Sequence, residues 1–166
     1  MKNLILFIAT MLTTTVYGQH IFTEQESNCN YQSMSLESSK ILVDYKSNDS
    51  LYYDLIKNVD VKYLSKLKGD VKIQLLVDSQ GSPCCVSVSN ETNVSSSKLR
   101  IVKNVNSMTG WRKPTSPYTK VCIIIELIYE NDKVTVKRLG VGGNRKFAEL
   151  NSFEIPKVSG NKNEKN

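Results

Sequence analysis

The sequence predicts a small α+β domain, an antiparallel sheet of three or four strands with one or two helices on one face. Residues 71–77 and 84–89 alternate apolar and polar side chains, as half-buried strands do. Residues 121–129 are almost continuously apolar and rich in isoleucine, which favours a strand with both faces covered. Between these stretches, residues 95–108 repeat apolar side chains every three or four positions, the spacing of a helix's buried face.

The amino-terminal stretch, residues 1–19, has the layout of a secretory signal peptide. It contains one lysine, an apolar run, and then threonines with small or polar residues. Cleavage is expected near Gly18 or Gln19, which would export the rest of the chain. The apolar run is shorter than the about 20 residues that cross a bilayer. No stable membrane span is therefore expected, and retention of the run as an uncleaved anchor is the alternative.

Residues 20–50 are expected to form a polar, partly ordered preamble. They are rich in serine, asparagine and glutamate and contain one short apolar run at 41–43. Asp49 or Ser50 can then cap a helix that starts at residue 51 and carries apolar side chains at helical spacing. This helix is expected to pack on the sheet.

The folded domain is predicted to span residues 51–139, with its core at 69–129. The core opens with a hairpin, because the sequence SQGSP breaks the first strand with Gly and Pro. After the helix come Trp111 and two prolines, Pro114 and Pro117, neither of which could continue a helix. A lone tryptophan at such a place is typical of a plug in the core.

The core resembles the C-terminal domain of the TonB energy-transducer family. The matching features are the strand led by Gly69, the D-x-x-G turn that ends at Gly81, the W-x-x-P element from Trp111 to Pro114, and the branched apolar strand at 121–129. The resemblance implies structural roles for these two glycines, for Trp111 and for Pro114. It also implies residence in the periplasm of a Gram-negative bacterium, with an extracellular location as the second choice.

The same resemblance implies a partner, namely an extended segment of an outer-membrane TonB-dependent transporter. The binding mode would be pairing of that segment with an exposed sheet edge. The edge of the final strand is the expected site, and the hairpin edge at 84–89 is the second choice. The residues assigned to the binding edge are Val121, Ile123, Ile125, Leu127 and Tyr129.

Two features depart from the family. The turn sequence ENDK predicts a fourth strand at 134–139, which could cover the binding edge, and residues 140–166 are expected to be a flexible tail. The prolines do not form a long proline-rich stretch before the domain. We therefore expect a binding module that does not transmit force by itself.

Four cysteines, Cys29, Cys84, Cys85 and Cys122, suit an exported chain with one or two disulfides. Neighbouring residues on a strand point to opposite faces, so only one of Cys84 and Cys85 could face Cys122. Cys85–Cys122 is the preferred pair. The spacing does not favour a zinc site, whose cysteines come in closely spaced pairs.

No catalytic residue, cofactor site or metal site is predicted. The single histidine, His20, adjoins the expected cleavage site, which removes the ordinary Ser-His and Cys-His mechanisms. Asp78 is explained by turn chemistry and Glu126 by exposure on a strand.

The formal net charge of +6 is spread over scattered lysines, without the basic cluster and exposed aromatics of a nucleic-acid-binding module. The expected partner is therefore a protein, and homodimerisation stays open. The alternative function is a secreted cystatin-like interaction or inhibitor domain that binds another protein.

Overall fold

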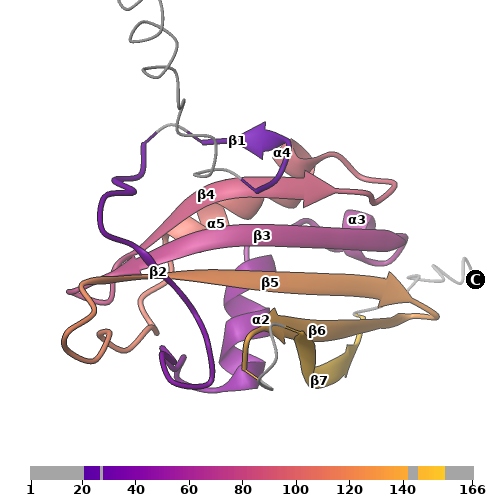
Figure 1. Cartoon of the computed structure of the whole chain (residues 1–166). Coiled ribbons are helices and arrows are strands. Elements are labelled where there is room, and N and C mark those ends of the chain that lie inside the picture. The colour runs from indigo at the N-terminus through magenta and orange to yellow at the C-terminus, as the bar shows by residue number, and fades with distance from the viewer. Residues whose placement is uncertain (1–20, 27, 142–145, 156–166) are drawn as a thin grey trace, which may run out of the picture.

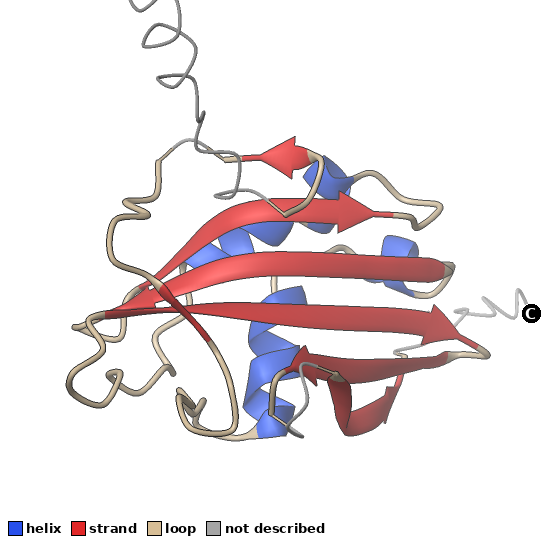
Figure 2. Cartoon of the chain, viewed as in Figure 1, coloured by secondary structure: helices blue, strands red, loops and turns tan. Residues whose placement is uncertain are grey.

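The computed structural model describes residues 21–26, 28–141 and 146–155. The described residues form one seven-stranded sheet in the order β1-β4-β3-β5-β6-β7, and β2 pairs with β5 outside that path. The helices lie on one face of the sheet (Figures 1 and 2). The predicted α+β class is confirmed, with more strands than expected. The expected signal peptide at 1–19 and residues 156–166 of the expected tail lie outside the described residues.

Three long strands form the middle of the sheet: β3 (Gly69–Asp78), β4 (Pro83–Asn90) and β5 (Lys120–Glu130). β3 lies between the other two and pairs antiparallel with both. The apolar residues that alternate along β3 face the helices and are at most 1% exposed; they are Val71, Ile73, Leu75 and Val77. The hairpin and the buried final strand of the predicted core are therefore present.

The D-x-x-G turn joins β3 to β4 as predicted. The Asp78 carboxylate accepts hydrogen bonds from the amides of Gln80 and Ser82 at 2.8 and 2.9 Å. Gly81 has a φ of +81°, and a Cβ there would lie 2.8 Å from the Trp111 carbonyl oxygen. Gly69 is constrained in the same way: its φ is +103°, and a Cβ there would lie 2.3 Å from the Glu91 carbonyl oxygen. Both positions require glycine.

Each predicted helix is divided in two. The helices are α2 (Asn48–Ile56), α3 (Val61–Leu64), α4 (Ser96–Leu99) and α5 (Ile101–Asn106). Ser47, rather than Asp49 or Ser50, caps α2 by accepting from the Ser50 amide. Arg100 separates α4 from α5 because its φ of +52° is left-handed. None of the described helices is long and apolar enough to cross a bilayer.

Beyond β5, strands β6 (Lys133–Leu139) and β7 (Phe147–Glu154) extend the sheet. β6 confirms the predicted fourth strand. β7 corrects the expectation that everything after residue 139 is a flexible tail. It pairs antiparallel with β6, and Leu150 and Phe153 pack against the main core. The Phe153 ring stacks on Tyr52 of α2 with centroids 4.6 Å apart.

The preamble covers part of the opposite face of the sheet through β1 (Glu24–Gln25), β2 (Ser35–Leu36) and the loops beside them (Figure 1). A second, smaller core lies under it and contains Cys29, Leu76, Val86 and Cys122. A disulfide between Cys29 and Cys84 ties the preamble to β4. The preamble is thus part of the fold.

The predicted disulfide between Cys85 and Cys122 is wrong, since both residues are free and buried. Cys85 is opposite Leu75 and Cys122 is opposite Leu76 on the intervening strand β3. The two cysteines are therefore two strands apart and on opposite faces of the sheet, beyond the reach of a disulfide.

Candidate functional site

The predicted binding edge on β5 is not free. β3 pairs with β5 along Lys120–Tyr129, β6 pairs with it from Ile125 onward, and β2 pairs with Val121 and Cys122 in parallel. The expectation that β5 offers an edge to a partner is therefore wrong, because this chain's own segments occupy both of its sides. The five assigned side chains instead line the main core, all at most 4% exposed: Val121, Ile123, Ile125, Leu127 and Tyr129.

The other two structural residues assigned from the sequence differ in burial. Trp111 is 6% exposed and packs edge-on against Tyr45, with ring centroids 4.8 Å apart. Pro114 is only half-buried, in the loop before β5. Trp111 is therefore the core plug that was predicted, whereas Pro114 belongs to the surface loop.

The second-choice edge, on β4, is also largely covered. β1 pairs with Ser87 and Val88 on the outer side of β4. The Glu26 amide donates to the Val86 carbonyl at 2.9 Å, and the Asn106 side chain accepts from the Cys85 amide at 2.7 Å. The preamble and α5 together thus provide hydrogen-bond partners for main-chain groups on the outer side of β4.

The outer side of β7 is different, because no described strand pairs with it. The Ile155 amide donates to the Asp132 carbonyl at 2.9 Å at the end of the β6–β7 ladder. Hydrogen-bonded and non-hydrogen-bonded pairs alternate in an antiparallel ladder. The main-chain groups of Glu154 and Ser152 therefore point away from β6.

Side chains alone cap part of this outer edge. Asn151 Oδ1 accepts from the Ser152 amide at 2.9 Å, and Asn48 Nδ2 donates to the Leu150 carbonyl at 3.3 Å. Asn151 Nδ2 also donates to the Asp49 carboxylate at 2.9 Å. Exposed asparagine rotamers can turn away from such bonds, so these caps protect the edge without closing it to another strand.

Charges of alternating sign cross the open face of the sheet and end at β7. One row runs from Lys72 through Glu126 and Lys137 to Glu149, each residue opposite the next. Lys72 Nζ lies 3.6 Å from Glu126 Oε1. A second row runs from Glu130 through Lys133 to Glu154, with 3.5 Å between Lys133 Nζ and Glu154 Oε1. Both rows end in an exposed glutamate on the outermost strand.

An aromatic group lies on the other side of β7, next to α2. Phe153 contacts buried Tyr52, and its ring centroid is 6.3 Å from that of Tyr53. Tyr53 is 59% exposed, although Tyr52 beside it is only 1% exposed. The outer strand thus has glutamates on one face and an exposed aromatic ring beside the other.

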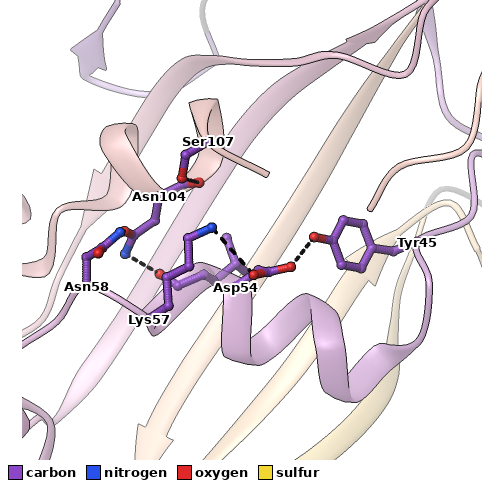
Figure 3. A network of polar contacts seen from close by, with 7 residues as sticks. Tyr45, Asp54, Lys57, Asn58, Asn104 and Ser107 are labelled. Carbon is purple, nitrogen blue, oxygen red and sulfur yellow. Dashed lines mark hydrogen bonds and ion pairs between the residues drawn. The ribbon is translucent and has the colours of Figure 1, made fainter. Parts of the chain in front are cut away.

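Polar contacts between α2 and its surroundings position that aromatic group (Figure 3). Asn104 of α5 donates to the Leu55 carbonyl at 2.7 Å and accepts from Asn58 at 2.7 Å. Asp54 accepts from the Tyr45 hydroxyl and lies 3.5 Å from Lys57 Nζ. These contacts hold the C-terminal half of α2 and thereby fix the place of its tyrosines beside β7.

A buried ion pair holds the preamble against β6. The Arg138 guanidinium donates two hydrogen bonds to the Glu37 carboxylate, one of them at 2.5 Å, and another to the Val43 carbonyl. Arg138 also lies 5.2 Å from the centroid of the Trp111 ring. Such a pair fixes where the preamble crosses the sheet and leaves no charge exposed there.

The described residues contain no group of three or more His, Cys, Asp or Glu side chains placed to hold a metal ion. Burial raises the pKa of the Cys85 thiol to about 12, which keeps it protonated and a poor nucleophile. The candidate binding surface of the described chain is the border formed by β7, with which no further described strand pairs.

Scans against protein-family models, curated proteins and solved structures gave no match to this chain. Only this chain's own residues therefore indicate its function. The sequence gives no strand signal for β7, because Phe147, Leu150 and Phe153 recur every three positions, which is not the alternation of a strand. A register shift opposite Val136 and Lys137 explains the step from Leu150 to Phe153, since a bulged strand carries one extra residue.

Proposed function

We propose that this chain is an exported, non-enzymatic binding module that recognises an extended segment of another protein by pairing it with the outer edge of β7. The observation that carries the proposal is the position of β7 at the border of the sheet, with main-chain groups of Ser152 and Glu154 turned outward. Unpaired strand edges bind extended peptides through main-chain hydrogen bonds.

The disulfide between Cys29 and Cys84 supports export, since such bonds persist in oxidising compartments. The resemblance of residues 69–129 to the TonB C-terminal domain favours the periplasm. It also favours segments of outer-membrane TonB-dependent transporters as partners. In this proposal β7 takes over the role first assigned to β5, and the module binds its partner without transmitting force.

Titration of the isotope-labelled chain, lacking residues 1–19, with synthetic transporter amino-terminal peptides tests the proposal. Backbone amide shifts are expected to concentrate at Ser152 and Glu154. Glu154→Pro removes an outward amide and should abolish binding while β6 keeps its pairing, because proline is tolerated on edge strands. Lys113→Pro, in the exposed loop before β5, serves as the matched control.

Shifts confined to β1 and β4 would place the binding site elsewhere and overturn the assignment to β7. The absence of shifts with every transporter peptide would remove the proposed partner class.

A further inference from the structure

We infer that the outer edge of β7 selects a segment carrying two basic side chains at the spacing of Lys133 and Lys137, with apolar residues between them. This inference rests on the proposed function and adds the chemistry of the partner. It follows from the juxtaposition of Glu149 and Glu154 at the border with Phe153 and Tyr53 beside them.

The charge rows provide the first step. Opposite charges directly across two strands stabilise their pairing, and like charges destabilise it. Both rows alternate in sign from strand to strand and stop at a glutamate on β7. A strand added beyond β7 would therefore place its own side chains against Glu149 and Glu154. Basic residues continue both rows, and acidic residues would meet like charges.

The spacing of the two basic residues follows from β6, whose own lysines already face the same two glutamates from the inner side of β7. Lys133 is opposite Glu154 and Lys137 is opposite Glu149. The sequence of β6 between these lysines is Val-Thr-Val. A segment of the form Lys-apolar-polar-apolar-Lys thus matches the charges of β7.

The aromatic group explains the apolar positions. Side chains next to the lysines on an added strand would point to the opposite face of the sheet. On β6 that face carries Val134, which is opposite Phe153. On an added strand it would meet Phe153 and the exposed ring of Tyr53, 6.3 Å apart. An apolar side chain there would cover the ring, which solvent now reaches.

Three synthetic peptides test the inference: one containing Lys-Val-Thr-Val-Lys, one with glutamines in place of both lysines, and one with glutamates. Binding to the chain lacking residues 1–19 would be followed by amide shifts at β7. The lysine peptide is expected to bind about fivefold more tightly than the glutamine peptide and to lose that advantage at high salt. The glutamate peptide is expected to bind weakest.

A charge exchange sharpens the test. Glu149→Lys combined with Glu154→Lys should reverse the order, so that the glutamate peptide binds best. Glu91→Lys combined with Asp44→Lys changes the net charge equally at exposed positions outside both charge rows and should leave the order unchanged. If the lysine variant proves unfolded by circular dichroism, Glu149→Gln with Glu154→Gln replaces it, and equal binding of all three peptides is expected.

The outcomes separate the inference from the proposed function. Equal binding of all three peptides to the unmodified chain, with shifts at β7, would overturn the charge selection and leave edge binding standing. No shift at β7 with any peptide would overturn both. A stable dimer in analytical ultracentrifugation whose β7 amides are protected would mean that a second copy occupies the edge, which also overturns the inference.

Discussion

Arg138 and Glu37 are both buried, so the contact between them matters more than any ion pair at the surface. Removal of one partner leaves the other charge buried without compensation, which is strongly destabilising. The exposed pair between Arg112 and Asp44, with 3.8 Å between its charged atoms, has no such penalty. The two ion pairs therefore allow a matched comparison of how much each contributes to the free energy of unfolding.

We predict that Glu37→Gln lowers the free energy of unfolding by about 3 kcal/mol. Asp44→Asn should change it by less than about 0.5 kcal/mol. Urea unfolding monitored by circular dichroism, analysed with a common m-value, measures both. Equal losses for the two variants would show that the buried pair has no special role.

The buried thiol of Cys85 makes stability depend on pH in alkaline solution. Burial raises its pKa from 9.0 to about 12. Above pH 9 the unfolded chain loses this proton while the folded chain keeps it, so the thiol's contribution to stability is present below pH 9 and lost as the pH rises towards 12. Cys85→Ala should therefore have a shallower decline in unfolding free energy between pH 8.5 and 10 than the unmodified chain. Parallel declines would contradict the prediction.

At the scale of single elements, the sequence predicted those strands and helices whose signal is local. The alternation along β3, the apolar content of β5 and the turn before β6 each depend on a few neighbouring residues. β1, β2 and β7 are short or bulged and exist only because the sheet is there to pair with them. Such non-local contacts produce no periodic pattern of apolar residues in the sequence.

The disulfide illustrates the same limit. Which cysteines form a disulfide depends on the path of the preamble. Strand geometry alone could only exclude some pairings of the cysteines. Because the bond closes a loop with a sequence separation of 55, its removal should release considerable entropy in the unfolded chain.

We predict that Cys29→Ala combined with Cys84→Ala lowers the free energy of unfolding by roughly 4 kcal/mol. Cys122→Ala, which removes a buried thiol and leaves the disulfide intact, should cost less than half of that. Mass spectrometry of an unreduced digest should recover residues 29 and 84 in one linked peptide pair. Because one peptide carries both Cys84 and Cys85, Cys85→Ala should keep the link to the peptide of Cys29. Loss of the link in that variant, or a link to the peptide of Cys122, would refute the assignment.

The attachment of β7 depends on Phe153 more than on its other aromatic residue. Phe153 packs on the main core and stacks on Tyr52, whereas Phe147 is not among the residues that contact the core. We predict that Phe153→Ala lowers the stability by about 2 kcal/mol and raises hydrogen exchange along β6 and β7. Phe147→Ala is the control and should leave both nearly unchanged.

On the scale of the whole fold, the described residues form a single sheet with a main core on one face and a smaller, disulfide-tied core on the other. The resemblance-based choice of β5 as the binding strand was wrong at this scale, since β5 lies in the interior of the sheet. The mode of binding stays a prediction, now for β7. Sequence reasoning could find the strands but could not order them, because strand order is set by the packing of the complete chain.

We predict that the preamble and the sheet unfold together. Trp111 reports on the contact between the preamble and β6, and far-ultraviolet circular dichroism reports on the whole sheet. Because β3 and β5 contribute to both cores, the two signals should give coincident urea transitions. A separate early transition in tryptophan fluorescence would show that the preamble detaches as an independent unit.

The position of β7 in the chain has a consequence for biogenesis. Ribosomes make proteins from the amino terminus, so β7 is synthesised after β6, the strand that it shields. A chain that ends before residue 147 would leave the border of β6 bare and Tyr52 without its stacked ring. Products that end before β7 should therefore associate with one another through β6, a hazard that is removed once β7 has paired with β6.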